Sequence, residues 1–304
     1  MSDPIYTPRR AARSRFVTLR GLRHHLLEWG DAAGASAERP TLVMLHGWMD
    51  VAASFQFVVD ALGGDRHVVA MDWRGFGETE TPAGDSYWMA DYLGDLEALL
   101  DALGAPGAPV DLLGHSMGGN VVMLYAGIRP QRMRRLINLE GFGMPATVPS
   151  MAPKRFAQWL DELKAPATLA PYASADAVAE RLRKNNPRLP ADKAAWLARR
   201  WSAPGDDGRW RLRADPAHKR VNPLLHHVEE TLEIWKRIEV PLLWVEGDQT
   251  DLSLWWGQRY TREEFHQRLQ VVHQVEKRLL PGAGHMLHHD QPEALAQHIE
   301  QFLD

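Results

Sequence analysis

Ser116 stands at the centre of a Gly-x-Ser-x-Gly pattern and is the first candidate for chemistry in this chain. An apolar run precedes it over 110–113, and an apolar, helix-compatible run follows over 121–126. This context predicts a strand that turns sharply into a helix, with the serine at the apex in a strained backbone conformation. Strand and helix can approach closely there because Gly114 and Gly118 carry no side chain. We therefore expect Ser116 to be a nucleophile.

His285 is the best candidate for the base that such a serine needs. A serine hydroxyl is a poor nucleophile at neutral pH unless a histidine, oriented by a carboxylate, accepts its proton. Of the 14 histidines, His285 lies downstream of the serine, directly after a predicted strand and in a glycine-flanked loop. That places it at the carboxyl edge of the sheet, where open α/β folds bind ligands. His115 adjoins Ser116, but the turn should direct it away, so we expect it to pack.

The carboxylate that orients the histidine is less clearly marked. Four acidic residues follow predicted strands at this edge: Glu140, Glu246, Asp248 and Asp251. Asp248 is our first choice, because the chain must turn before a carboxylate can point sideways to the histidine, and Gly247 supplies that turn. Glu140 is the main alternative.

Two backbone N–H groups are candidates to stabilise a developing oxyanion. The first belongs to Met117, directly after the serine, where the start of the helix adds its dipole. The second belongs to Trp48, in the loop that follows the strand predicted over 41–45. Gly47 would let this loop approach the serine closely.

We expect neither a metal nor another cofactor. The chain contains no cysteine, which excludes disulfides, thiolate ligands and a cysteine nucleophile. The histidine pairs 226–227 and 288–289 do not make a metal motif, because adjacent side chains rarely converge on one ion and no carboxylate motif completes either pair.

The elements that must position these residues alternate along the chain. Strands are predicted over 16–20, 22–29, 41–45, 67–71, 110–113, 136–139, 240–245 and 275–280. Helices are predicted over 54–62, 87–103, 121–126, 258–270 and 292–303. This alternation predicts an α/β fold, with a mostly parallel central sheet and helices on both faces.

The stretch 145–236 departs from this alternation, because it has helical pieces broken by prolines and no strand-like apolar run. We interpret it as a helical lid inserted into a core made of 1–144 and 237–304. Its helical pieces are predicted over 154–164, 175–184, 191–201 and 224–234, and its tryptophans are Trp159, Trp196, Trp201, Trp210 and Trp235. These side chains could pack the lid's own core or line an apolar pocket, and the sequence leaves both open.

Composition narrows the class of partner. With 45% hydrophobic and 24% charged residues, the chain is of globular type. A net charge of −4 gives no reason to expect nucleic acid or an anionic membrane as partner. The first fifteen residues are polar and rich in arginine, unlike a secretory signal. We expect a cytoplasmic protein that acts on a small molecule, and a homo-oligomer is compatible with the sequence.

Together these residues resemble the α/β-hydrolase family over nearly the whole chain outside 145–236. The resemblance rests on His46-Gly47-Trp48, the loop 72–79, Gly114-His115-Ser116-Met117-Gly118 and Gly284-His285. The order Ser116, Asp248, His285 is the family's order of nucleophile, acid and base. One departure concerns the acid loop, since relatives place a glycine directly after the strand with the aspartate three residues on. Here Gly247 directly precedes Asp248.

The resemblance implies a lidded serine esterase. Haloalkane dehalogenases and epoxide hydrolases of this family use an aspartate nucleophile, so Ser116 argues against both activities. The expected function is cleavage of carboxylic esters of small to medium apolar substrates through an acyl-enzyme. The alternatives are a carbon–carbon bond hydrolase of the meta-cleavage type and a ligand-binding relative that no longer turns over substrate.

Overall fold

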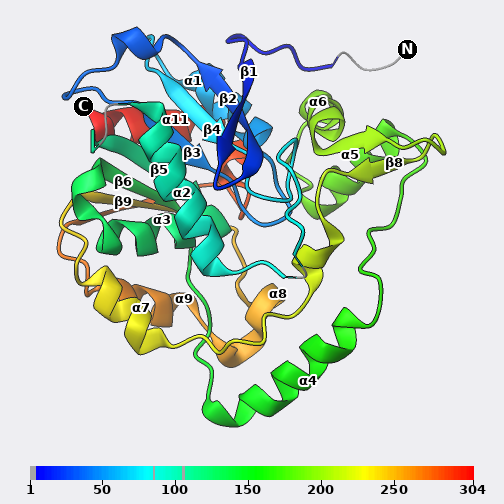
Figure 1. Ribbon diagram of the computed structural model, residues 1–304. Coiled ribbons are helices and arrows are strands. Elements are labelled where there is room, and N and C mark those ends of the chain that lie inside the picture. The colour runs from blue at the N-terminus through cyan, green and yellow to red at the C-terminus, as the bar shows by residue number, and fades with distance from the viewer. Residues whose placement is uncertain (1–4, 85, 105–106) are drawn as a thin grey trace.

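An eight-stranded sheet forms the centre of the computed structural model, which describes residues 5–84, 86–104 and 107–304 (Figure 1). Its strands are β1 (Arg13–Leu19), β2 (Leu22–Trp29), β3 (Leu42–Leu45), β4 (Val68–Met71), β5 (Val110–His115), β6 (Met133–Leu139), β9 (Leu242–Gly247) and β10 (Val275–Leu280). They lie in the order β1-β2-β4-β3-β5-β6-β9-β10. The pairs β1–β2 and β2–β4 are antiparallel, and the remaining pairs are parallel. The expected mostly parallel sheet is confirmed.

Helices cover both faces of this sheet. The core helices are α1 (Gln56–Ala61), α2 (Met89–Leu103), α3 (Met117–Ile128), α8 (Ser253–Trp256), α9 (Arg262–Leu269), α10 (Leu287–Asp290) and α11 (Pro292–Leu303). The 3-10 segments are η1 (Ala32–Gly34), η2 (Ala52–Phe55), η3 (Pro130–Arg132), η4 (Pro149–Met151), η5 (Pro216–Lys219) and η6 (Gly257–Arg259). Helices α1 and α11 pack in one core, whereas α2, α3 and α9 pack in the other.

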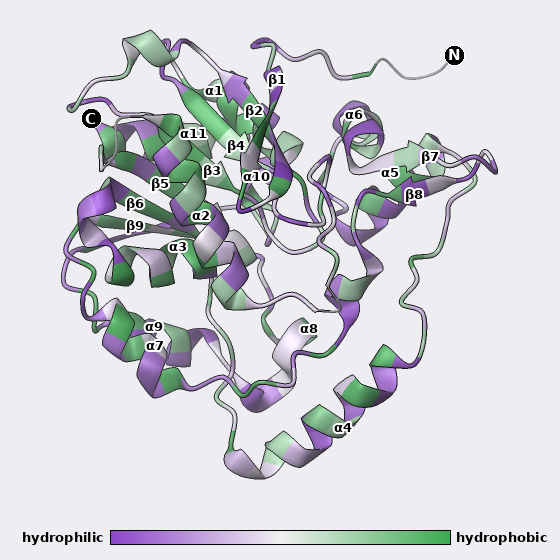
Figure 2. Ribbon diagram, in the orientation of Figure 1, coloured by the Kyte–Doolittle hydropathy of each residue, from purple (hydrophilic) through white to green (hydrophobic). Residues whose placement is uncertain are grey.

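The residues of strand β3 belong alternately to the two cores. All four of its residues are fully buried, as a strand between two helix layers must be. Leu42 and Met44 belong to the core of α1 and α11, while Val43 and Leu45 belong to the core of α2 and α3. In Figure 2 both β3 and β4 carry the hydrophobic colour along their length. The continuous apolar runs therefore predict buried parallel strands correctly.

The segment between β6 and β9 leaves the sheet and returns to it. It contains α4 (Ala152–Leu163), α5 (Ala175–Asn185), α6 (Ala191–Trp201) and α7 (Val228–Trp235). A two-stranded hairpin of β7 (Ser202–Pro204) and β8 (Trp210–Leu212) also lies here, although the sequence pattern predicts no strand in this segment. Three residues are too few to show an alternating pattern.

Within the described residues, no helix has the length and apolarity that would allow it to cross a membrane. Residues 1–4, part of the predicted core and of the polar N-terminal stretch, lie outside the described residues.

Helix α7 rests on α3 where a glycine permits it. A Cβ placed on Gly127 would lie 1.9 Å from the carbonyl oxygen of Ile234, which no real side chain tolerates. The end of the segment between β6 and β9 is thus seated on the core by a close backbone contact.

We expect Gly127→Ala to lower the free energy of unfolding by roughly 1–2 kcal/mol, because overpacking outweighs the better helix propensity of alanine. Thermal or urea unfolding measures the change. Gly34→Ala is the matched control, since a Cβ at Gly34 meets nothing within 4 Å. Equal stability of the two variants would contradict the close contact.

Candidate active site

Ser116 lies at the turn between β5 and α3 with φ 52° and ψ −115°, a strained conformation for a residue with a side chain. The flanking glycines are needed for this turn. A Cβ on Gly114 would lie 2.3 Å from the carbonyl oxygen of Gly118, and one on Gly118 would lie 2.2 Å from that of Leu45. The turn predicted from the Gly-x-Ser-x-Gly pattern is present.

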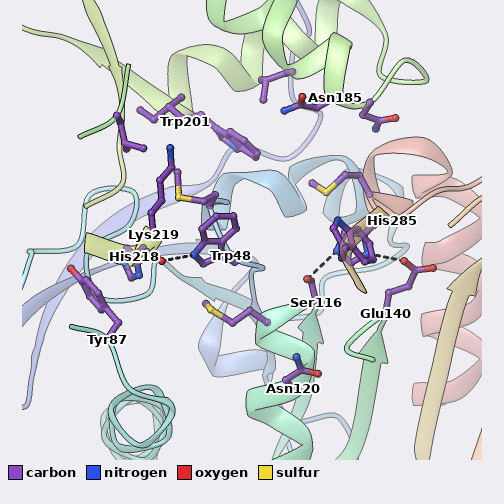
Figure 3. A pocket seen from close by; sticks show the side chains of 18 of the residues that line it. Trp48, Tyr87, Ser116, Asn120, Glu140, Asn185, Trp201, His218, Lys219 and His285 are labelled. Atoms are coloured by element: carbon purple, nitrogen blue, oxygen red, sulfur yellow. Dashed lines mark hydrogen bonds and ion pairs between the residues drawn. The ribbon is translucent and has the colours of Figure 1, made fainter. Parts of the chain in front are cut away.

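Three side chains form a hydrogen-bonded row at this edge of the sheet (Figure 3). Nε2 of His285 lies 3.0 Å from Oγ of Ser116, and Nδ1 of His285 lies 2.8 Å from Oε2 of Glu140. A carboxylate only accepts hydrogen bonds, so Nδ1 carries the proton and Nε2 is left to accept one from the serine. The structure thus brings Ser116 and His285 together as expected.

The carboxylate in this row is Glu140 and not Asp248, the first choice from the sequence, so the geometry favours the alternative. Asp248 lies exposed, and its Oδ1 accepts a hydrogen bond from the N–H of Gly282 at 2.8 Å. The physical reason is the length of β9. Gly247 does not begin a turn but is the last residue of the strand, paired with Leu280 of β10. The chain therefore turns only after Gly247, and Asp248 caps the loop after β10.

The other two acidic candidates are also engaged elsewhere. Glu246 contacts Nε2 of His266 at 3.1 Å, and Asp251 accepts from the N–H of Ser253 at 2.9 Å. The two ring nitrogens of His285 contact Glu140 and Ser116 instead.

Glu140 is held at both carboxylate oxygens. It is 1% exposed, and its Oε1 accepts from the N–H of Gly247 and the hydroxyl of Thr250, both at 2.7 Å. With the His285 contact, three donors compensate the buried charge. Its backbone has φ 54°, a left-handed conformation that is rare outside glycine. A turn at the end of β6 thus aims the side chain at β9 and the histidine.

The loop after β3 approaches the serine closely. A Cβ on Gly47 would lie 3.1 Å from Cβ of Ser116, so the backbone that carries the N–H of Trp48 passes beside this serine. The N–H of Met117 belongs to the first residue of α3. Both positions agree with the expected oxyanion donors, whose role remains a proposal.

Trp48 is also fixed by its side chain. Its Nε1 donates to the carbonyl oxygen of His218 at 3.2 Å, although half of the residue is exposed (Figure 3). His218 stacks between Phe76 and Tyr87, with ring centroids 3.7 Å and 3.5 Å away. A residue from η5 thereby anchors a residue of the β3 loop.

A cavity of about 1180 Å³ opens over this site. Ser116, His285 and Trp48 line it together with residues of the segment between β6 and β9. Of the tryptophans of that segment, Trp201 lines this cavity, Trp196 packs in a core, and Trp235 is buried beside a second cavity. Trp201 therefore fits the expectation of a pocket residue, whereas Trp196 and Trp235 pack in the cores that flank the sheet and not in a separate core of this segment.

His115 packs behind the serine, as expected. Its Nε2 donates to the carbonyl oxygen of His285 at 2.8 Å, which ties the two loops together. Burial, with His288 and His285 nearby, holds the pKa of His115 well below its usual value, so the ring is neutral.

Asp50, His115 and His288 are the one group with metal-type ligands among the described residues. Their ligand atoms lie within 4.8 Å of one another, and Nε2 of His288 is 3.7 Å from Oδ2 of Asp50. The expectation that the chain binds no metal stays a prediction.

A central parallel sheet with a strained serine turn at its carboxyl edge defines an α/β-hydrolase architecture. The model of the alpha/beta hydrolase family matches residues 42–298. The chain belongs to this family, which confirms the resemblance, and the names of its relatives support a hydrolase.

Two relatives and one solved structure illustrate the likeness. A serine hydrolase-like protein from Danio rerio is 33% identical over 40% of this chain and 37% of that protein. A 3-hydroxybutyrate-oligomer hydrolase from Cupriavidus necator is 30% identical over 85% of each chain. A thioesterase domain from the curacin biosynthetic pathway superposes with a TM-score of 0.82 at 26% identity, covering 96% of this chain and 99% of that one. The first relatives are matched over about a third of their length.

The burial of His218 has a consequence for stability. Burial lowers the pKa of His218 to about 4, against an opposing effect of Asp215. Its ring nitrogens contact the hydroxyl of Tyr92 and the carbonyl oxygen of Arg74, both at 3.2 Å. The folded state thus favours the neutral ring, and this contribution to stability is complete above pH 6.5, the unfolded value.

We expect that contribution, on the order of 3 kcal/mol, to be lost as the pH falls from about 6.5 to 4. Thermal unfolding across this range measures it. In His218→Gln, which cannot titrate, the decline of Tm with falling pH should be shallower than in the wild type. Identical slopes would contradict the lowered pKa.

Proposed function

We propose that this protein is a serine hydrolase that cleaves carboxylic esters of small to medium apolar substrates through an acyl-enzyme. The observation that carries the proposal is the row of Ser116, His285 and Glu140, with contacts of 3.0 Å and 2.8 Å at the mouth of a large cavity. The names of two similar proteins, an oligomer hydrolase and a thioesterase domain, support acyl chemistry.

In the first half of the reaction, Oγ of Ser116 attacks the ester carbon and its proton passes to Nε2 of His285. Glu140 accepts the hydrogen bond from Nδ1, orients the ring and stabilises its positive charge. The N–H groups of Met117 and Trp48 are the proposed donors to the tetrahedral oxyanion. The carbon–oxygen bond to the alcohol then breaks, and His285 gives the alcohol its proton.

In the second half, water attacks the acyl-enzyme and His285 accepts its proton. The second tetrahedral intermediate collapses, the bond to Ser116 breaks, and His285 returns a proton to Oγ. The products are one acid and one alcohol per ester and water, with the protein unchanged.

We further propose that residues 145–236 are a cap on a core of 1–144 and 237–304. Helix α5 and the 3-10 segment η5 both contribute walls to the cavity of Ser116. The lining of the cavity as a whole is mostly apolar, which favours an apolar part in the substrate.

Replacement of the nucleophile is the direct test. We expect the wild-type protein to take up one fluorophosphonate and to hydrolyse 4-nitrophenyl esters, and Ser116→Ala to lose both, with turnover falling by more than about 10⁴-fold. Mass spectrometry of the labelled peptide and nitrophenolate release provide the readouts.

Ser36→Ala is the control. Ser36 lies exposed between β2 and β3, so this variant should be labelled normally. Labelling of Ser116→Ala to the wild-type extent would refute the nucleophile. Labelling without turnover of any ester would instead support a ligand-binding relative.

The identity of the acid can be tested separately. We expect Glu140→Gln to reduce kcat by about 10⁴-fold, since the histidine loses both its orientation and the partner of its charge. Asp248→Asn makes the same chemical change on an exposed carboxylate that accepts from the N–H of Gly282, and it should retain near wild-type turnover. The reverse ranking of the two variants would restore Asp248 as the acid.

A further inference from the structure

Lys219 and Arg181 bring positive charge into the cavity of Ser116 without a protein partner. Both line the cavity and both are exposed. Within the described residues, neither side chain has a hydrogen bond or an ion pair. Arg220 also lines the cavity but interacts with other residues, so it is not counted with these two cations.

The negative charge in the cavity does not balance these cations. Glu140 is the one carboxylate among the described residues of its lining. Both of its oxygens are already engaged, by His285 on one side and by Gly247 and Thr250 on the other. The lining therefore has a surplus of positive charge that a bound anion would compensate.

The backbone of Lys219 is held firmly, although its side chain is free. Asp215 accepts from the N–H of Ala217 at 3.0 Å at the start of η5, and its own N–H donates to Gly75 at 2.7 Å. The neighbouring carbonyl of His218 accepts from Trp48 at 3.2 Å. The ammonium group is thus attached to a fixed point beside the predicted oxyanion donors.

Arg181 lines the same cavity from α5, together with Asn185 one helical turn later. Val178 and Leu182 of the same helix line it as well and are buried. Helix α5 therefore presents to the cavity a face that combines buried apolar side chains with the exposed Arg181 and Asn185.

The position of Lys219 relative to Ser116 determines which part of the substrate it contacts. In Figure 3, Ser116 lies between His285 on one side and Trp48 with Lys219 on the other. His285 must protonate the leaving alcohol, so the alcohol lies on the His285 side. The acyl chain then extends along Trp48 and Trp201 toward Lys219.

We propose that the preferred substrates are esters whose acyl chain ends in an anionic group, such as half-esters of dicarboxylic acids. The apolar walls contact the methylene chain, and Lys219 and Arg181 bind the terminal carboxylate. This inference rests on the proposed acyl-enzyme chemistry and names its substrate class.

Binding without turnover tests the subsite itself. In calorimetric titrations of Ser116→Ala, monomethyl suberate should bind about tenfold more tightly than dimethyl suberate. Two exposed cations should each increase the affinity roughly two- to fivefold. Equal binding of the two esters would overturn the inference, whatever the outcome for catalysis.

Turnover in the wild-type protein provides the second measurement. The ratio of kcat/KM for mono-4-nitrophenyl suberate to that for 4-nitrophenyl octanoate should be about ten at low salt. It should fall as sodium chloride is added. Lys219→Glu should reduce this ratio below one.

Lys164→Glu is the matched control, because it makes the same change in net charge at an exposed residue paired with Asp161 on α4. It should keep the wild-type ratio. An equal fall in both variants, or no preference in the wild type, would overturn the anionic subsite. If both esters are hydrolysed with no preference, the serine hydrolase stands and only this inference fails.

Discussion

The site depends on one close backbone approach, that of α3 to the ends of β3 and β5. It is allowed because Gly114 and Gly118 have no side chain, and a Cβ at either would fall within 2.3 Å of a carbonyl oxygen. The strain at Ser116 follows from it, and so does the position of the acid. The N–H of Ser116 donates to the carbonyl of Leu139 at 2.8 Å, so the nucleophile is bonded to the residue directly before Glu140. A single tight turn therefore sets the distance between two members of the row, and the strain is sustained by the buried sheet around it.

Glu140 is a buried carboxylate whose charge is stabilised by the surrounding hydrogen-bond donors. Removing a carboxylate from water is costly unless donors replace the solvent, and here the protein supplies a backbone N–H, a hydroxyl and an imidazole. Its left-handed backbone is supported from both sides, since Asn138 accepts from the N–H of Gly141 at 2.8 Å and Gly119 packs against Asn138. The carboxylate therefore has little freedom beside Nδ1 of His285. In the proposed reaction this would be electrostatic preorganisation built from the ends of β6 and β9.

The sequence predicts the features that depend on local pattern. The eight strands of the sheet, the turn at Ser116 and the position of His285 follow from apolar runs and glycine spacing, and all are present. The acid is different, because its identity depends on where β9 ends. That end is fixed by pairing of Gly247 with Leu280, a contact between strands 33 residues apart that no local pattern contains. Because the strand continues through Gly247, the side chain of Asp248 reaches Gly282, and His285 meets Glu140 at the end of β6 instead. The displaced glycine before Asp248 was the available indication.

The polar side chains around the cavity differ in how tightly they are fixed, and this difference affects substrate selectivity. Ser116, His285 and Glu140 are fixed by hydrogen bonds, as chemistry at one carbon atom requires. Lys219 is fixed only at its backbone, and its flexible stem lets the ammonium group meet an anion at several distances. A subsite of this kind discriminates charge but tolerates chain length. Discrimination by length must then come from the rigid walls, where Trp201 is held by a hydrogen bond from its Nε1 to Ser54 at 3.1 Å and Leu182 is buried in α5. Charge and length are thus selected by different elements of the same cavity, one mobile at its tip and the other packed into the core.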